Sequence, residues 1–222
     1  MKIDFDFRLI DVSLELFALE DHLELIEKQM ENLQKSERDI LDTLIRREKL
    51  SPEDPEWHEA IQNYDLRFDF LLPRAFRGSF LVALYAVYES SVTEIARLIQ
   101  ASKGQSIALG DLKGDFLYRS KKYFKSILQF DLCNDNKVWQ RIKMLAEVRN
   151  AFAHVNGRLE MLNTGSRKKI RNWGKQGFGI ENYNGYLVVN AGFTKKTFDL
   201  VRSSLEELVE RYKDWDSKRK SA

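Results

Sequence analysis

The stretch FLVALYAVYESSVTEIARLI, residues 80–99, decides the fold class of this chain. Its apolar residues recur mostly at three- and four-residue intervals, which is the spacing of one helix face. The face consists of Phe80, Leu84, Val87, Val92, Ile95 and Ile99, widened by Leu81, Tyr85 and Tyr88. Because a helix with so wide an apolar face must be covered by other elements, we expect a helix over about 76–101 at the centre of a bundle.

Upstream of this helix, residues 12–44 predict a long helix with a narrow apolar seam. The seam recurs in a 4-3 pattern, as in a coiled coil, with a single polar exception. Its members are Val12, Leu16, Leu19, Leu23, Ile26, Met30, Leu33, Glu37, Ile40 and Leu44. Such a helix, which we extend to residues 12–50, packs either within its own bundle or against a second subunit. A second helix is expected to start at Pro55, with Asp54 as its N-cap, and to end before Pro73.

Downstream, two further helices are expected to complete a core over residues 76–155, and a loop is expected after it. A basic helix is expected over about 112–128, and a helix with an apolar stripe over about 136–153. The stretch RKKIRNWGKQGFG, residues 167–179, is basic and glycine-rich and is expected to be a mobile loop.

The C-terminal region predicts a small β-hairpin followed by a last helix. Short β-prone runs flank Tyr183-Asn184-Gly185, so a hairpin is expected within 178–190. Thr194 is the predicted cap of a helix over 194–217, whose apolar stripe consists of Phe198, Val201, Leu205, Leu208, Tyr212 and Trp215. The fold class is therefore all-α: a helical bundle with a long N-terminal helix and a small β-hairpin insertion before the last helix, in a single domain over 1–222.

The composition excludes several classes of protein. The 222 residues are 43% hydrophobic and 32% charged, which is typical of a globular protein. The single cysteine, Cys133, excludes an internal disulfide and a cysteine-based zinc site. The longest apolar run, Phe80–Tyr88, is half the length of a membrane span, and the N-terminus is acidic where a signal peptide would be basic. We therefore expect a soluble, cytoplasmic protein that does not cross a membrane.

The charge is distributed unevenly along the chain, although the net charge is only +2. Residues 1–60 contain 8 basic and 17 acidic side chains, whereas residues 111–180 contain 15 basic and 6 acidic ones. A polarised chain of this kind favours an anionic partner, of which nucleic acid is the commonest.

The string Arg149-Asn150-Ala151-Phe152-Ala153-His154 breaks the local pattern. The apolar stripe of the helix steps through Val138, Ile142 and Leu145 to position 149, so Arg149 is expected to face the core and to need an anion. A histidine exchanges protons near neutral pH, and an arginine fork holds a phosphate. These side chains suit RNA cleavage without a metal or other cofactor. An ordinary alternative is that Arg149 pairs with Glu89 or Glu147, and that His154 merely ends a helix.

An R-N-x-x-x-H string near the end of a helix in a small all-α bundle resembles the HEPN family, the R-x4–6-H ribonucleases of prokaryotic defence and toxin systems. The apolar helix 80–99 is similar to the helix that pairs with the motif helix in that family. By this resemblance Arg149, Asn150 and His154 are catalytic-site residues, and Glu89 is a further acidic residue near the motif. Some HEPN toxins have a tyrosine two residues after the histidine; this chain has Asn156 there, which argues against that subgroup.

The resemblance implies a metal-independent endoribonuclease that acts as a homodimer, with the motifs of two subunits facing each other. It also implies control by an antitoxin or another regulatory protein partner. Two basic stretches are expected to bind single-stranded RNA by charge and by stacking on Tyr123, Phe124 and Trp173. The stretches are Arg119–Lys125 and Arg167–Lys175, and the residues expected to bind RNA are Arg119, Lys121, Lys122, Lys125, Arg167, Lys168, Lys169 and Arg171.

Two other functions account for the same sequence. A non-catalytic HEPN-like module would bind RNA, a nucleotide or a protein and would keep the motif for binding or packing. A coiled-coil interaction protein would use residues 12–44 as its working surface, and the motif would have no role.

Overall fold

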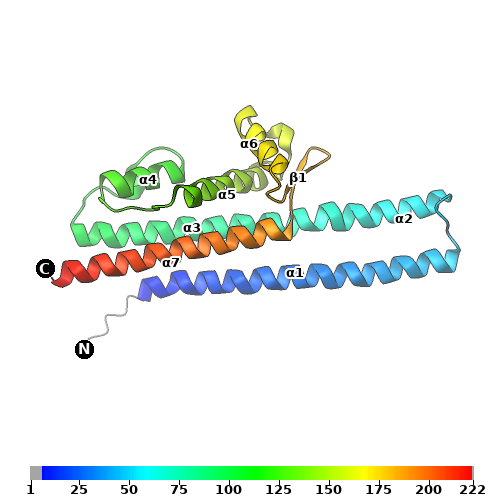
Figure 1. The fold of residues 1–222 in the computed structure, drawn as a ribbon, viewed down its shortest axis with the longest axis horizontal. Coiled ribbons are helices and arrows are strands. Elements are labelled where there is room, and N and C mark those ends of the chain that lie inside the picture. The colour runs from blue at the N-terminus through cyan, green and yellow to red at the C-terminus, as the bar shows by residue number, and fades with distance from the viewer. Residues whose placement is uncertain (1–6, 222) are drawn as a thin grey trace. The chain divides into compact units, whose positions relative to one another are not determined.

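The computed structural model describes residues 7–221, and their side chains from Leu9 onward (Figure 1). The first six residues, whose acids argue against a signal peptide, lie outside the described residues. In chain order the main elements are α1 (Phe7–Glu48), α2 (Pro55–Asp65), a π-helical turn (Leu66–Leu71), α3 (Leu72–Lys103), α4 (Phe116–Ser126), α5 (Asn136–Val155), α6 (Thr164–Lys175), β1 (Ile180–Tyr183), β2 (Tyr186–Val189) and α7 (Ala191–Ser221). Short 3-10 turns lie at Leu109–Asp111 and Leu159–Met161. The predicted all-α bundle, with its long first helix and its hairpin before the last helix, is confirmed.

The described residues form two compact units that interleave along the chain. The first unit contains residues 7–20, 83–147 and 196–221, and the second contains residues 21–82 and 148–195. Each unit thus collects segments of several helices. The Arg149–His154 motif and the hairpin both belong to the second unit.

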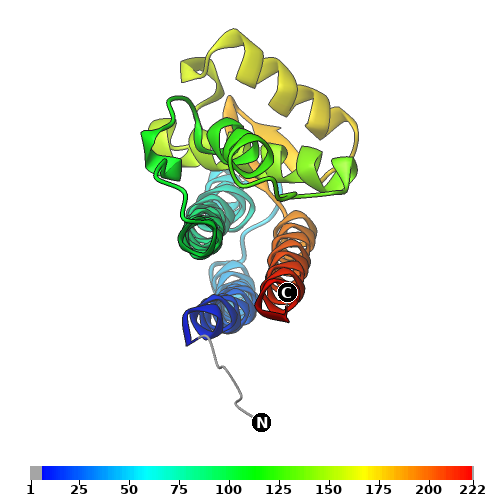
Figure 2. The ribbon, with the colours of Figure 1, turned by 90° about the vertical axis from the view of Figure 1, so that its left-hand side faces the viewer.

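In the first unit, the C-terminal part of α3 and most of α7 supply the core. Their predicted apolar faces are confirmed, because the following side chains have 0–1% of their surface exposed: Leu84, Val92, Ile95, Ile99, Val201, Leu205 and Leu208. The beginning of α1 lies beside the C-terminal part of α7 in both views (Figures 1 and 2). An ion pair of 2.7 Å between Arg202 Nη1 and Glu20 Oε1 connects these two helices.

The seam of α1 follows the predicted 4-3 pattern only over its first half. Val12 and Ile26 bound the part of the seam that is buried, but Ile40 is 60% exposed and Leu41 takes its place with 7% exposed. A straight α-helix has 3.6 residues per turn, so a strict seven-residue repeat drifts by about 20° in each heptad. Over the 28 residues from Val12 to Ile40 this drift adds up to about 80°, which is close to the rotation of about 100° between successive residues. The buried stripe therefore moves forward by one position, and the extrapolation to Ile40 and Leu44 was wrong.

The predicted helix break before Pro73 does not occur. α2, the turn Leu66–Leu71 and α3 follow one another without an interruption. In the turn the hydrogen bonds are π-helical, and the N–H of Leu72 donates to the carbonyl of Arg67, five residues earlier. Proline normally interrupts a helix because it lacks an N–H and its ring collides with the preceding turn. The wider π-turn directly before Pro73 relieves that collision, so the helix continues.

The continuous helix Pro55–Lys103 has the length and apolar composition of a membrane span, and among residues 7–221 it is the one helix that does. The central helix of a soluble bundle has the same properties. Leu81, Tyr88 and Ile95 of this helix are buried against protein, although only 39% of its most apolar 18-residue window is buried. A cytoplasmic location stays a prediction.

The hairpin forms where the sequence predicts it. β1 and β2 pair antiparallel, with Tyr183 opposite Tyr186, and Asn184-Gly185 makes the two-residue turn. Both turn residues have positive φ, 48° and 87°, which suits the Asn-Gly pair because glycine carries no Cβ and asparagine tolerates the left-handed region.

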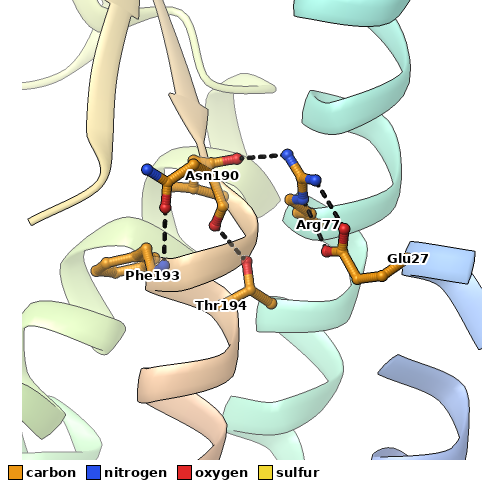
Figure 3. A network of polar contacts seen from close by, with 6 residues as sticks. Glu27, Arg77, Asn190, Phe193 and Thr194 are labelled. Atoms are coloured by element: carbon orange, nitrogen blue, oxygen red, sulfur yellow. Dashed lines mark hydrogen bonds and ion pairs between the residues drawn. The ribbon is translucent and has the colours of Figure 1, made fainter. Parts of the chain in front are cut away.

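The start of α7 differs from the prediction, because Asn190 and not Thr194 is its N-cap. The Oδ1 atom of Asn190 accepts a hydrogen bond of 2.8 Å from the N–H of Phe193 (Figure 3). Thr194 is fully buried in the first turn, and its hydroxyl donates back to the carbonyl of Asn190 at 3.1 Å. An N-cap side chain binds N–H groups two or three residues ahead, which Asn190 does and Thr194 does not.

A bidentate ion pair lies beside this cap. Arg77 donates from Nε and Nη2 to the two carboxylate oxygens of Glu27 at 2.8 and 2.7 Å (Figure 3). The remaining Nη1 donates to the carbonyl of Val189 at 3.4 Å. Arg77 thus connects α3 to both α1 and the end of β2 within the second unit.

The basic stretch that was predicted to be a mobile loop is largely helical. Residues 164–175 form α6, which begins at the N-cap Asn163, whose Oδ1 accepts from the N–H of Ser166 at 2.9 Å. Two glycines lower the helix propensity of this segment. The buried Ile170 and the packing of α6 on β1 offset that cost, and packing of this kind is not visible in local sequence.

Candidate functional site

The motif occupies the last two turns of α5. The helix continues to Val155, and then Asn156 and Gly157 adopt positive φ values of 49° and 74° and end it. The N–H of Gly157 donates to the carbonyl of Ala151 at 2.8 Å, which closes the last turn. His154 is therefore held one residue before the end of a regular helix, as the sequence predicted.

Arg149 does not occupy the predicted core position. The buried stripe of α5 passes through Leu145, Val148 and Ala151, each with no exposed surface. Arg149 is next to this stripe and is half-buried, because the stripe advances by three residues at Val148 where four were expected. Its Nη1 donates to Oδ1 of the exposed Asn150 at 2.9 Å. Arg149 therefore lies at the edge of the core, where one side of the guanidinium packs on protein.

His154 is exposed, and regular helix geometry separates it from Arg149. Residues five apart on an α-helix are rotated by about 140° around its axis and displaced by about 7.5 Å along it. The two side chains of one chain thus leave α5 in different directions. A substrate that contacts both Arg149 and His154 of one chain must extend around the helix. Alternatively, one phosphate can contact Arg149 of one motif and His154 of a second motif that faces it.

Sequence reasoning missed a group of cations and aromatic rings at the end of α5. Arg74 Nη1 donates to the carbonyl of Asn156 at 3.0 Å. The same guanidinium lies 4.7 Å from the ring centre of Phe70 and 4.9 Å from that of Tyr186. Arg158, which is exposed, lies 5.8 Å from the Tyr186 ring on the segment that follows the motif. The end of α5 therefore carries two further positive charges.

The hairpin holds this group in position. The N–H of Leu187 donates to the carbonyl of Gly157, and the N–H of Leu159 donates to the carbonyl of Gly185, both at 2.8 Å. Tyr183 stacks on Phe70 with ring centres 4.9 Å apart. Arg74 lies 82 residues from its acceptor in the chain, so no local signal could have pointed to it.

A glycine allows the close approach of α3 to the motif helix. A Cβ atom on Gly78 would lie 2.7 Å from a ring carbon of Phe152, which is far too short a contact. Phe152 lies between Arg149 and His154 on α5. The small size of residue 78 therefore sets the position of the motif helix against α3.

Glu89 belongs to the first unit, whereas the motif belongs to the second. It lines an open pocket of about 630 Å³ together with acidic and basic side chains from α1, α3 and α4. The charged lining residues of this pocket are Asp11, Glu15, Glu89, Glu94, Arg97 and Arg119. A role for Glu89 beside the motif stays a prediction.

The basic residues of α4 are exposed, but the predicted stacking aromatics are not. Lys121, Lys122 and Lys125 face solvent, and Arg119 is half-buried. Tyr123 and Phe124 have no exposed surface, and the Tyr123 hydroxyl donates to the carbonyl of Ile107 at 2.7 Å. The prediction that these two rings stack on RNA was wrong, because they form the apolar side of an amphipathic helix.

The basic residues of α6 divide into a structural arginine and a group facing solvent. Arg167 is half-buried, and its Nη2 donates to the carbonyls of Glu160 and Leu162 at 2.5 and 3.1 Å. Lys168, Lys169 and Arg171 are exposed, and Trp173 is half-buried. α6 contains no acidic residue, so it presents an uninterrupted cationic surface.

The remaining candidate ligands do not form a site of their own. Within residues 7–221, no three His, Cys, Asp or Glu side chains converge as metal ligands. Burial raises the pKa of the Cys133 thiol, an effect that its hydrogen bond to the Asp135 carbonyl only partly opposes. His22 packs edge-on against Phe80, and His58 against Trp57.

Comparison of the chain with protein-family models, with curated proteins and with solved structures finds no match. The resemblance to the HEPN family therefore rests on the motif and its helical setting.

Proposed function

We propose that this protein is a metal-independent endoribonuclease of the toxin or defence type, with His154 as general acid or base and Arg149 on the phosphate. The observation that carries the proposal is the exposed imidazole of His154 at the end of α5, in one compact unit with Arg149, Arg158 and Arg74. Positive side chains attract a phosphodiester, and histidine exchanges protons near neutral pH.

In the proposed reaction His154 accepts the proton of a ribose 2′-hydroxyl while the 2′-oxygen forms a bond to phosphorus. The bond between phosphorus and the 5′-oxygen breaks, and the leaving oxygen receives a proton from a second acid. The products are a 2′,3′-cyclic phosphate and a 5′-hydroxyl end. Arg149 stabilises the charge that develops on the phosphate oxygens, and Asn150 orients Arg149 through their hydrogen bond.

A homodimer is part of the proposal. One chain supplies one motif histidine, whereas the reaction needs a base and an acid on opposite sides of the phosphate. The rotation of about 140° between Arg149 and His154 on α5 also favours a phosphate that is held between two motifs. The family resemblance also implies an inhibitory protein. Such a protein would keep the enzyme inactive by covering the space between the two facing motifs of the homodimer.

The same rotation favours a second function if the chain stays monomeric. Arg149 and His154 of one chain would then contact different parts of a ligand and would not act on one phosphate. The protein would in that case be a non-catalytic RNA-, nucleotide- or protein-binding module.

The test is cleavage of end-labelled single-stranded and structured RNAs by purified protein in the presence of EDTA. We expect discrete products with 2′,3′-cyclic phosphate ends, and a loss of at least 100-fold in the His154→Ala variant, since general acid–base catalysis contributes on the order of 10²–10⁴-fold. The matched control is His58→Ala, which removes another exposed histidine of the same unit.

Arg149→Lys separates the phosphate role from simple charge. We expect it to retain RNA binding and to lose most of the cleavage rate, because lysine cannot form the bidentate contact. Equal cleavage by the wild type, His154→Ala and Arg149→Lys would disprove the assignment. Salt-sensitive RNA binding without cleavage would establish the binding module instead.

A further inference from the structure

A second pocket lies between α6 and the hairpin in the second unit. Its volume is about 520 Å³, within the range of roughly 300–1,000 Å³ that is typical of small-molecule sites. It is lined by Leu159, Ile170, Arg171, Gly174, Lys175, Ile180, Glu181 and Asn182. None of these residues belongs to the proposed catalytic motif.

The floor of this pocket is apolar and closely packed. Leu159, Ile170 and Ile180 have 1–3% of their surface exposed. A Cβ atom on Gly174 would lie 2.9 Å from the carbonyl oxygen of Ile180, so the backbones of α6 and β1 are in direct contact there. A flat apolar ring would gain dispersion and hydrophobic contacts on such a floor.

The rim of the pocket carries two cations, Arg171 and Lys175, and one carboxylate, Glu181. Arg171 and Lys175 are four residues apart on α6 and therefore lie on the same side of that helix. Both are exposed, and within the described part of the chain neither makes an ion pair or a side-chain hydrogen bond. Two cations of this kind beside an apolar slot suit a phosphate that is attached to a planar group.

The outer edge of β1 adds hydrogen-bonding groups to the wall. Asn190 donates its N–H to the carbonyl of Gly179. In an antiparallel pair every second residue forms hydrogen bonds to the other strand, so Gly179, Glu181 and Tyr183 are the residues that bond toward β2. By that alternation Ile180 and Asn182 direct their N–H and C=O groups away from β2. The Ile180 carbonyl packs against Gly174, whereas the exposed Asn182 offers its N–H beside its C=O, a donor and an acceptor like those on the edges of adenine and guanine.

We infer that this pocket binds one unstacked purine nucleotide, with the base on the apolar floor and against the β1 edge, and its phosphate on Arg171 and Lys175. Unstacked bases of single-stranded RNA are usually held on aromatic side chains beside a positively charged groove, and here the apolar floor takes the place of the aromatic surface. As part of an RNA path to His154 the inference rests on the proposed function, and it then names the substrate class: single-stranded RNA that presents a splayed-out purine. Binding of a mononucleotide does not depend on that function.

The test is isothermal titration of the full chain with AMP, GMP, UMP and inorganic phosphate. We expect AMP or GMP to bind at least tenfold more tightly than UMP and than inorganic phosphate, because only a purine fills the slot. The double variant Arg171→Ala/Lys175→Ala should weaken purine nucleotide binding at least tenfold. The matched control Lys28→Ala/Lys35→Ala removes the same charge from exposed positions of α1 in the same unit, outside the pocket, and should change binding less than twofold.

Equal losses in the two double variants would show charge attraction alone and would overturn the inference, as would no binding by any nucleotide. The cleavage assay separates this result from the proposed function. If the wild type binds purine nucleotides but does not cleave RNA, the nucleotide-binding pocket is supported and the ribonuclease proposal is disproved. If RNA cleavage depends on His154 but no mononucleotide binds, the ribonuclease proposal is supported and the nucleotide-binding pocket is disproved.

Discussion

Removing Arg77 should destabilise the protein far more than removing an exposed lysine that makes an ion pair of the same length. The Arg77 side chain is 15% exposed and its partner Glu27 23%, and two charge-assisted hydrogen bonds of 2.8 and 2.7 Å connect them (Figure 3). In the Arg77→Ala variant the Glu27 carboxylate would stay largely covered without its cation. It would lose charged hydrogen bonds that contribute about 1.5–3 kcal/mol each.

The expected cost is smaller than for a fully buried pair. Removing one partner of a buried ion pair costs about 3–5 kcal/mol, but water still reaches part of both Arg77 and Glu27. We therefore expect the free energy of unfolding to fall by about 2–3 kcal/mol in Arg77→Ala. At a urea dependence of about 2–3 kcal/mol per M, the midpoint of urea unfolding should fall by about 1 M.

Two further variants identify the cause. Lys213 and Glu210 are also 2.7 Å apart, but their side chains are 53% and 68% exposed. Lys213→Ala should therefore cost less than about 0.5 kcal/mol, because solvent screens the pair. Arg77→Lys keeps the charge but not the bidentate geometry, and it should lie between Arg77→Ala and the wild type. Urea unfolding monitored by circular dichroism measures all three, and equal midpoints for Arg77→Ala and Lys213→Ala would refute the reasoning.

Three other perturbations have expected outcomes. Asn190→Ala removes the N-cap of α7 and should lower the free energy of unfolding by about 1 kcal/mol in urea titrations, whereas Asn190→Asp should keep most of it. Gly78→Ala should lower the thermal unfolding midpoint by several degrees, because its Cβ would lie 2.7 Å from Phe152; combining it with Phe152→Ala should recover part of the loss. Burial raises the pKa of Asp216, but hydrogen bonds from Lys220 and Arg219 outweigh burial and lower this pKa below its ordinary value. The carboxylate is then a stabilising group above its unfolded pKa and loses that effect as the pH falls, so the stability difference between wild type and Asp216→Asn should shrink from pH 6 to pH 3.

The sequence and the structure agree on the hairpin turn, on the buried faces of α3 and α7, and on the place where α5 ends. The alternation around Asn184-Gly185 predicted the hairpin turn at the right residues, because positive φ at two successive positions favours this residue pair. Periodicity predicted the buried faces of α3 and α7, because one face of each helix is apolar at helical spacing. His154 lies near the end of α5, in agreement with the helix predicted over about 136–153, and Asn156 and Gly157 end this helix with positive φ values.

The errors arose where tertiary contacts override a local rule. The π-turn before Pro73 preserves a helix that proline would break by itself. In α5 the buried stripe includes Val148, because the packing of the helix turns this residue toward the core. Arg149 is the next residue around the helix and is therefore half-buried instead of fully buried. The basic segment of α6 becomes helical because Ile170 packs into the unit and Gly174 lets β1 approach.

By itself the sequence determined the all-α class, the hairpin turn and the residues of the motif, because each of these depends on neighbours within a few positions of the chain. Only the tertiary structure decided that Arg74, Phe70 and Tyr186 surround the end of α5, and that α6 and β1 enclose a pocket with Arg171 and Lys175 on its rim. Those arrangements join residues that are distant in the chain. The physical reason is that contacts between such residues depend on how whole helices pack, which no local pattern encodes.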